Sequence, residues 1–304
     1  MTLEPLHYLN ERDADPDLQS LVETHCQTGQ GDRLFARMWT PATTPIVGCV
    51  IIVHGLGEHS GRYRPVAEQL ARCGWATLAA DLPGHGMSPG RRGHLPSYFG
   101  LLQDIDAMRL TMQRLQPAMP QVLLGHSMGG NFAVNYVLRQ DELDASLEQL
   151  AGLVLSGPMF LPTNPPNRTQ IFAAWLTGLL VPWFTVRTPV DTDKLTNNTE
   201  TVKSIREDPL MHGRISIYLA TQLLAQGRFA LDHAASVNVP TLLMHGEDDP
   251  ITSYRASESF AIRAGEQVEF AAFPSMLHEI FHETNSEVVF QKLRQWLGKQ
   301  IADR

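Results

Sequence analysis

The sequence predicts an α/β fold in which a mostly parallel central sheet is flanked by helices and carries an inserted helical cap. Two observations predict the sheet: short apolar runs alternate with helical segments of about 10–15 residues, and the runs are rich in β-branched side chains. A third observation predicts the cap, because the alternation stops between residues 158 and 237. The chain has 304 residues, enough for one large domain or a domain with an insertion.

The expected strands and helices alternate along the chain. Residues 19–39 favour two strands that turn at TGQGD, residues 28–32. The run IVGCVIIVH, residues 46–54, is apolar almost throughout, which is typical of a strand buried on both faces. Later strands are expected at residues 76–81, 121–126, 151–157, 239–246 and 267–273. Helices are expected at residues 63–72, 97–116, 131–140, 253–265 and 286–301.

The stretch without a sheet strand is too long for an ordinary connection. It begins with a proline-rich segment, continues with the apolar residues 171–184 and a polar run, and ends in a helical pattern at residues 215–226. We therefore expect a core made of residues 1–157 and 238–304, with residues 158–237 inserted as a cap of helices.

Composition excludes several classes of protein. Hydrophobic residues make up 43% and charged residues 18%, as in globular proteins. The net charge is −8 and no basic stripe is present, which argues against a nucleic-acid partner. Three cysteines form neither a disulfide framework nor a C-x-x-C pair, and the acidic N-terminus has no apolar signal-peptide region. These features favour a cytoplasmic protein. The apolar residues 171–184 are shorter than the roughly 20 that a spanning helix needs, so we expect them at an interface or in a lid.

The best candidate for a nucleophile is Ser127. It lies in GHSMGG, directly after an expected strand and directly before a helix, and Gly125-x-Ser127-x-Gly129 is the nucleophile-elbow pattern. The two glycines allow a sharp turn that lifts the hydroxyl above the sheet and points the helix N-terminus at it. That end of a helix stabilises developing negative charge.

A His-Gly-rich loop, HGLGEHSGRY at residues 54–63, follows the strand at residues 46–54. Such a loop can present a backbone N–H to an oxyanion. We expect the N–H groups of Leu56 and Met128 to form the oxyanion hole, and His54 to stabilise the loop.

An acid and a base follow two later strands, at the same edge of the predicted sheet. HGEDDPITS, residues 245–253, offers Asp248 and Asp249, and either could orient a histidine. PSMLHEIFHE places His278 after the last strand. The order Ser, Asp, His along the chain is that of the α/β-hydrolases.

The residues from His278 to His282 also match H-E-x-x-H, a zinc pattern when both histidines lie on one helix face. The metzincin continuation fails, because Asn285 stands where glycine is needed and Val288 where the third histidine is needed. We therefore predict no metal, and we expect His282 on the surface.

Residues 46–301 resemble the monoacylglycerol lipase and lysophospholipase branch of the α/β-hydrolases, also called serine aminopeptidase-like. The matching segments include HGLGEHSGRY, DLPGHGMSPGRRGH (81–94), GHSMGG, GEDDPIT and LHEI. The resemblance selects Asp249 over Asp248, and His278 as the base. It also implies that Glu58 and Arg62 lie near the polar head of the substrate, although a local ion pair would explain them equally well. Phe281 departs from the family, because the vertebrate enzyme has a second histidine there near glycerol.

The resemblance implies a serine esterase that cleaves a lipid ester, most simply monoacylglycerol, through an acyl-enzyme and without a cofactor. The apolar cap residues could line an acyl tunnel and touch a bilayer, or simply pack the cap onto the core. They are Phe172, Trp175, Leu176, Leu179, Leu180, Trp183 and Phe184.

Other functions fit parts of the pattern. A lysophospholipase, or an esterase or thioesterase for shorter acyl groups, would use the same three residues. An aminopeptidase would need cap acids to bind a free amine, and the available ones lie in polar stretches: Asp191, Asp193, Glu200, Glu207 and Asp208. A non-catalytic binding protein is disfavoured because Ser127, Asp249, His278 and the oxyanion loop are all present.

Overall fold

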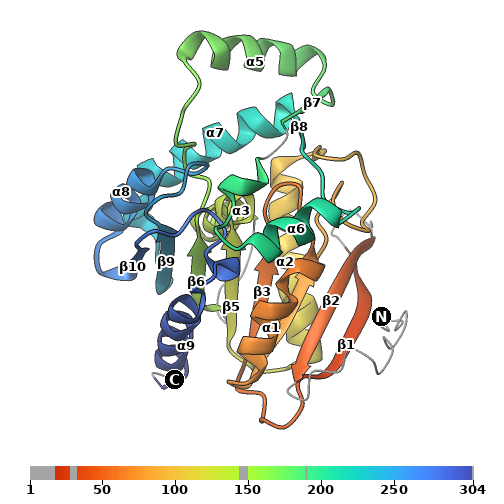
Figure 1. Ribbon diagram of the computed structural model, residues 1–304, viewed down its shortest axis with the longest axis vertical. Helices are drawn as coiled ribbons and strands as arrows, with labels where there is room; N and C mark the ends of the chain where they lie inside the picture. Colours follow the sequence, from red (N-terminus) through yellow and green to blue (C-terminus); the bar gives the residue numbers. More distant parts are fainter. Residues whose placement is uncertain (1–17, 28–32, 144–149, 189–190, 303–304) are drawn as a thin grey trace.

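The computed structural model describes residues 18–27, 33–143, 150–188 and 191–302. Within these residues, eight strands form one sheet in the order β1-β2-β4-β3-β5-β6-β9-β10 (Figure 1). β2 pairs antiparallel with both of its neighbours, and the pairs from β4 to β10 are parallel. The strands are β1 (Leu18–Gln27), β2 (Arg33–Pro41), β3 (Gly48–Val53), β4 (Trp75–Ala80), β5 (Gln121–His126), β6 (Leu150–Ser156), β9 (Thr241–Gly246) and β10 (Val268–Phe273).

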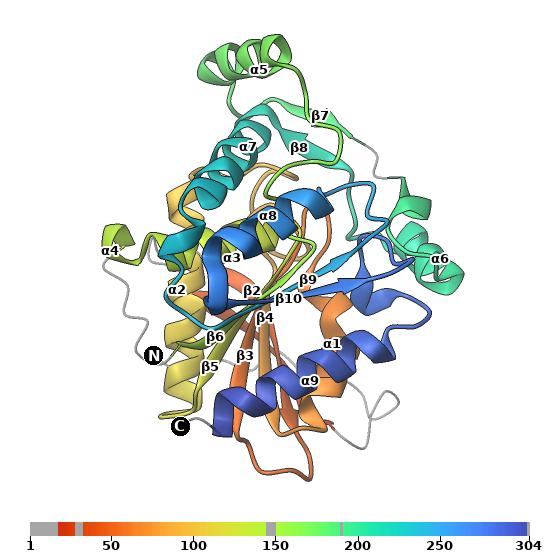
Figure 2. The same ribbon diagram turned by 90° about the vertical axis from the view of Figure 1, so that its left-hand side faces the viewer.

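Helices cover both faces of the sheet and form two hydrophobic cores (Figure 2). One face carries α2 (Tyr98–Leu115), α3 (Met128–Leu138) and α8 (Tyr254–Ala264). The other carries α1 (Arg64–Ala71) and α9 (Glu287–Ala302). Every residue of the central strands is buried, because a parallel strand between two helical layers has no face left for water. The predicted α/β fold with a mostly parallel sheet is confirmed.

The stretch between β6 and β9 adds no strand to the main sheet. It contains α5 (Arg168–Leu180), β7 (Thr185–Arg187), the 3-10 helix η3 (Thr192–Lys194), α6 (Thr199–Glu207), β8 (Arg214–Ser216) and α7 (Ile217–Asp232). β7 and β8 pair as a two-stranded antiparallel ribbon, which the sequence did not predict. A strand of three residues carries no periodic pattern that the sequence could reveal. The boundaries of the cap at residues 158 and 237 stay a prediction.

Two parts of this stretch are packed differently. α7 packs against α3 and buries Leu219 and Leu223 in the same core. α5 lies beyond α7, farthest from the sheet in both views (Figures 1 and 2). On and just after α5, Phe172 is 61% exposed, Leu180 74% and Trp183 51%. The side chains of Trp175 and Leu179 lie outside the described residues. Across the described residues we find no helix with the length and apolar character that crossing a membrane requires.

Candidate active site

Ser127 occupies a strained turn between β5 and α3. Its φ of 52° and ψ of −117° are rare for a residue with a side chain, and such a conformation costs of order 1–3 kcal/mol. Two backbone hydrogen bonds hold the turn, since Ser127 N donates to Ser156 O at 2.9 Å and Ser127 O accepts from Met159 N at 2.9 Å. The flanking glycines are required by space. A Cβ on Gly129 would collide with the carbonyl oxygen of Val53, and a Cβ on Gly125 would collide with that of Gly129.

The carboxylate of Asp249, in the loop after β9, holds His278. His278 Nδ1 lies 2.7 Å from Asp249 Oδ2, and the hydroxyl of Thr252 donates to the same oxygen at 2.7 Å. Asp249 Oδ1 accepts from the backbone N–H groups of Ile251 at 2.7 Å and Thr252 at 3.0 Å. Asp248 is exposed, whereas Asp249 is buried. The structure therefore brings Asp249, and not its neighbour, to the histidine.

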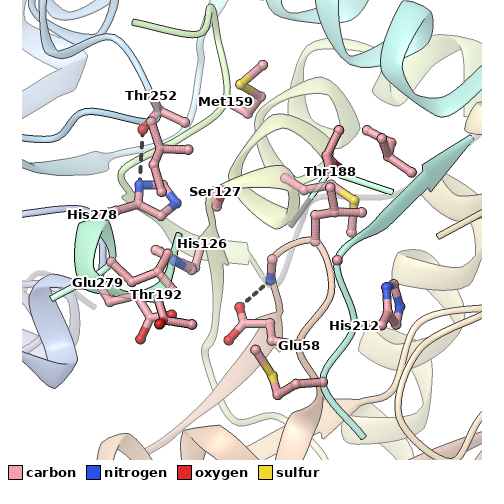
Figure 3. Close-up of a pocket in the computed structure, with 18 of the residues that line it drawn as sticks. Glu58, His126, Ser127, Met159, Thr188, Thr192, His212, Thr252, His278 and Glu279 are labelled. Atoms are coloured by element: carbon pink, nitrogen blue, oxygen red, sulfur yellow. Dashed lines mark hydrogen bonds between the residues drawn. The ribbon is translucent and has the colours of Figure 1, made fainter. Parts of the chain in front are cut away.

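The electrostatics of this pair set the tautomer of His278. Burial raises the pKa of Asp249, but the charge of His278 and hydrogen bonds from His245 and His278 hold that pKa well below its ordinary value. The carboxylate is therefore ionised and can only accept, so His278 Nδ1 carries a proton and Nε2 is left to face the serine. Burial lowers the pKa of His278, but the charge of Asp249 outweighs it and the pKa is raised. Figure 3 shows the Ser127 side chain beside the His278 ring, and both line one cavity.

His126 lies next to His278 but has a lower pKa. The two ring centroids are 4.8 Å apart. Burial and the charge of His278 lower the pKa of His126 to about 4. Near neutral pH a proton at this site therefore goes to His278.

His54 holds the loop at residues 54–63, in which we expect one N–H of the oxyanion hole. Leu82 N donates to His54 Nε2 at 2.9 Å, so that nitrogen is the acceptor and Nδ1 carries the proton. His54 Nδ1 donates to Gly55 O at 2.8 Å. Because a peptide is planar and trans, fixing the carbonyl of Gly55 also fixes the N–H of Leu56, which points the opposite way. Leu56 and Met128 both line the cavity beside Ser127.

The cavity has a volume of about 820 Å³, within the range of small-molecule sites. One end is formed by Ser127, His278 and residues of the loop at 54–63. Apolar side chains from the core and cap line much of the remaining wall, among them Met159, Leu195, Ile205, Ile215, Leu223 and Leu224. The predicted tunnel residues Phe172 and Trp183 are not among the residues that line it, because Phe172 on α5 and Trp183 just after α5 are exposed to solvent. A role for these two residues in substrate binding stays a prediction.

Comparison with known proteins decides the family. Residues 44–285 match the hydrolase family described as serine aminopeptidase, S33. The chain belongs to this family. A monoacylglycerol lipase from Mycolicibacterium smegmatis is 30% identical to this S33 hydrolase over 273 residues, which are 89% of this chain and 95% of that protein. An abhydrolase domain-containing protein from Dictyostelium discoideum is 32% identical over 276 residues, 90% of this chain, and this chain spans 28% of that protein's length.

Structural comparison agrees. The crystal structure of a monoacylglycerol lipase from Paleococcus ferrophilus superposes on the S33 hydrolase with a TM-score of 0.78 at 30% identity, covering 88% of this chain and 99% of that chain. The resemblance inferred from the motifs is confirmed, and so is the prediction of a hydrolase with the α/β-hydrolase fold.

Glu58, Arg62 and Glu279 also line the cavity of the S33 hydrolase. Sequence reasoning gave Glu279 no role in substrate binding. Arg62 Nη1 donates to Glu58 Oε2 at 2.9 Å and to Glu279 Oε1 at 2.8 Å, and Arg62 Nη2 donates to Glu279 Oε2 at 2.6 Å. The ion pair of Glu58 and Arg62 is therefore real, but it is buried and faces the cavity. The sequence carried no signal for Glu279 beyond its place next to His278.

The H-E-x-x-H residues lack the arrangement that the zinc pattern requires. His278 lies in a loop and His282 ends the 3-10 helix η6 (Ile280–His282), so the two are not on one α-helical face. Across the described residues, no group of three His, Cys, Asp or Glu side chains is placed to hold a metal ion. His282 is half-buried against the carbonyl oxygen of Arg62, at 3.1 Å from Nε2, so the expectation of a surface residue was wrong. Phe281 points away from the cavity and packs on Phe290 in the core.

Proposed function

We propose that this chain is a monoacylglycerol lipase that releases a fatty acid and glycerol through Ser127, His278 and Asp249. One observation carries the proposal. The Asp249–His278 contact of 2.7 Å lies beside Ser127, where the polar end of a cavity meets its apolar wall. An ester with one long acyl chain and a small polar alcohol matches that division.

The proposed reaction uses these groups in two steps. His278 Nε2 takes the proton of Ser127 Oγ as the oxygen attacks the ester carbonyl. The N–H groups of Leu56 and Met128 stabilise the oxyanion. His278 then gives its proton to the departing alcohol, and activates a water molecule that hydrolyses the acyl-enzyme. Asp249 holds the tautomer and stabilises the imidazolium. Every step uses groups of this chain and water.

The cap has a second proposed role, in peripheral contact with a lipid surface. Phe172, Leu180 and Trp183 are more than half exposed on the part of the molecule farthest from the sheet. Large apolar side chains of this kind favour the boundary between head groups and acyl chains. Such contact would place the cavity close to the lipid from which the substrate comes.

The aminopeptidase alternative gains no support from the cap acids. Asp191 and Asp193 are exposed and pair with Lys194 and Arg206. Asp208 lines the cavity but accepts from His59 Nε2 at 2.8 Å. None of these carboxylates is held ready for a free amine.

The test is a panel of substrates with one variant. The panel holds monoacylglycerols of several chain lengths, lysophospholipids, short p-nitrophenyl esters and aminoacyl-naphthylamides. We expect fast turnover of long-chain monoacylglycerol that is lost in Ser127→Ala and unaffected by a zinc chelator. A preference for short esters or aminoacyl amides would overturn the proposal that monoacylglycerol is the substrate. Activity that survives Ser127→Ala, or a fluorophosphonate that leaves Ser127 unlabelled, would overturn the mechanism.

A further inference from the structure

Glu279 is a buried carboxylate at the reacting end of the cavity, directly after the proposed base. It is 4% exposed, and Glu58 on the other side of Arg62 is 3% exposed. One guanidinium is therefore shared by two carboxylates, through contacts of 2.6–2.9 Å. Figure 3 shows both carboxylates on the same side of Ser127.

The charges of this cluster do not cancel. Burial raises the pKa of Glu58 and of Glu279, but the charge of Arg62 outweighs burial and both pKa values lie below the ordinary value. Both carboxylates are thus ionised against one cation. His282, 3.4 Å from Glu279, does not compensate, because burial lowers its pKa. The cluster therefore keeps one net negative charge near neutral pH.

Among the described residues, none of the other charged side chains that line the cavity forms an ion pair with Glu58 or Glu279. Asp208 adds a further carboxylate whose pKa is lowered despite burial, mainly by hydrogen bonds from His59 and a backbone N–H. Arg206 pairs with Asp193 at 2.7 Å. Arg187 lies on β7, exposed at the cap.

The hydrogen bonds of the two carboxylates also show that this end of the cavity has an excess of acceptors. A carboxylate oxygen can accept about two hydrogen bonds. Glu58 Oε1 is filled by Gly55 N at 2.5 Å and by the hydroxyl of Tyr63 at 2.8 Å. Glu58 Oε2 and both oxygens of Glu279 each accept from Arg62, which leaves each of them able to accept once more. The polar end of the cavity therefore offers acceptors and needs donors.

We propose that Glu279, acting with Glu58, makes this end of the cavity selective for an uncharged head group with free hydroxyls and against a head group that carries a phosphate. The inference rests on the proposed function and narrows it. The two free hydroxyls of a monoacylglycerol supply the donors that the carboxylates lack. A phosphate supplies acceptor oxygens and negative charge, so it would meet like charges in a buried site.

The experiment compares kcat/KM for a 1-acylglycerol and for the 1-acylglycerol 3-phosphate with the same acyl chain. Wild type should prefer the neutral lipid by roughly 100-fold or more, because like charges placed together in an interface are strongly unfavourable. Glu279→Gln removes one charge and should narrow this ratio by roughly tenfold. Glu279→Asp should restore most of the preference. Glu68→Gln, which alters the Arg64–Glu68 pair on the outside of α1, should leave the ratio unchanged.

The ratio of the two kcat/KM values distinguishes a role of Glu279 in head-group selectivity from a purely structural role. A purely structural role for Glu279 would lower both rates equally and keep the ratio, which would overturn the inference. Equal cleavage of both lipids by wild type would also overturn it, while the proposed lipase activity would stand. Failure of wild type to cleave 1-acylglycerol would instead remove the proposed function. If Glu279→Gln does not fold, Glu58→Gln tests the same charge, and an unchanged ratio there has the same meaning.

Discussion

Asp248 and Asp249 are adjacent in the chain, yet replacing each with asparagine should have very different effects. Asp249 Oδ2 accepts from His278 Nδ1, from the hydroxyl of Thr252 and from His245 Nε2, at 2.7–3.0 Å. In Asp249→Asn an NH₂ group takes the place of that oxygen, while the other oxygen keeps its bonds to backbone N–H groups. A donor then faces the N–H of His278, and the ring must move its proton to Nε2, which can no longer accept from Ser127.

The size of the effect follows from this wrong tautomer. We expect kcat of Asp249→Asn to fall roughly 10⁴-fold, which corresponds to about 5.4 kcal/mol of transition-state stabilisation. Asp248 is exposed, so Asp248→Asn should change kcat less than twofold. Steady-state hydrolysis of a soluble ester by both variants measures the difference, and thermal unfolding shows whether Asp249→Asn is still folded.

The pH profile gives an independent reading of the same pair. His278 must be neutral to accept the proton of Ser127, and its pKa is raised above the ordinary value of 6.5. The acid limb of kcat/KM for wild type should therefore lie above pH 6.5, and activity should be lost as the pH falls through it. Removing the carboxylate lowers the pKa of His278, so the limb should move to lower pH in Asp249→Asn and stay in place in Asp248→Asn. Activity of folded Asp249→Asn within tenfold of that of Asp248→Asn would refute the assigned role of Asp249.

Three further predictions test the surroundings of the site. His54→Ala removes the hydrogen bond that fixes the Leu56 N–H, so kcat should fall roughly 10²-fold with KM nearly unchanged; an unchanged kcat would mean that the loop holds itself. Gly129→Ala places a Cβ against the carbonyl of Val53, and should lower the free energy of unfolding by about 2–4 kcal/mol in a denaturant titration; full stability would contradict the steric argument. Leu180→Glu should weaken cosedimentation with phospholipid vesicles while hydrolysis of a soluble ester is kept; unaltered sedimentation would exclude α5 as the contact.

The central sheet was predictable because its strands are buried on both faces. That burial requires apolar runs, and such runs can be seen without a structure. β5 begins and ends where the sequence placed it, and β9 begins two residues later. The cap was predictable only as an interruption. β7 and β8 have three residues each, and residues 188–213 separate them along the chain. Their pairing therefore depends on the tertiary fold.

The apolar cap segment shows why composition could not place a binding surface. The apolar run at residues 171–184 indicates a surface that packs against another apolar group. It does not indicate which face of the segment packs, or whether the partner is the core, the substrate or a lipid. α5 packs along α7 and leaves Phe172, Leu180 and Trp183 in solvent, while less conspicuous residues such as Met159 and Leu223 line the cavity. The direction of each side chain follows from how the helix sits on its neighbour, which no local pattern records.

The dipeptide His278-Glu279 fits two interpretations, a zinc site and a serine hydrolase site, and only the fold distinguishes them. Within H-E-x-x-H the glutamate would be the base and the histidine a metal ligand, and that requires an α-helix across five residues. The turn after β10 instead sends His278 to Asp249 and Glu279 to Arg62, which is 217 positions earlier in the chain. A sequence pattern can report that a histidine and an acid are neighbours. It cannot report that Arg62 will bind both Glu279 and Glu58, so that one of the two negative charges has no positive partner. The proposed selectivity for an uncharged head group depends on that extra negative charge.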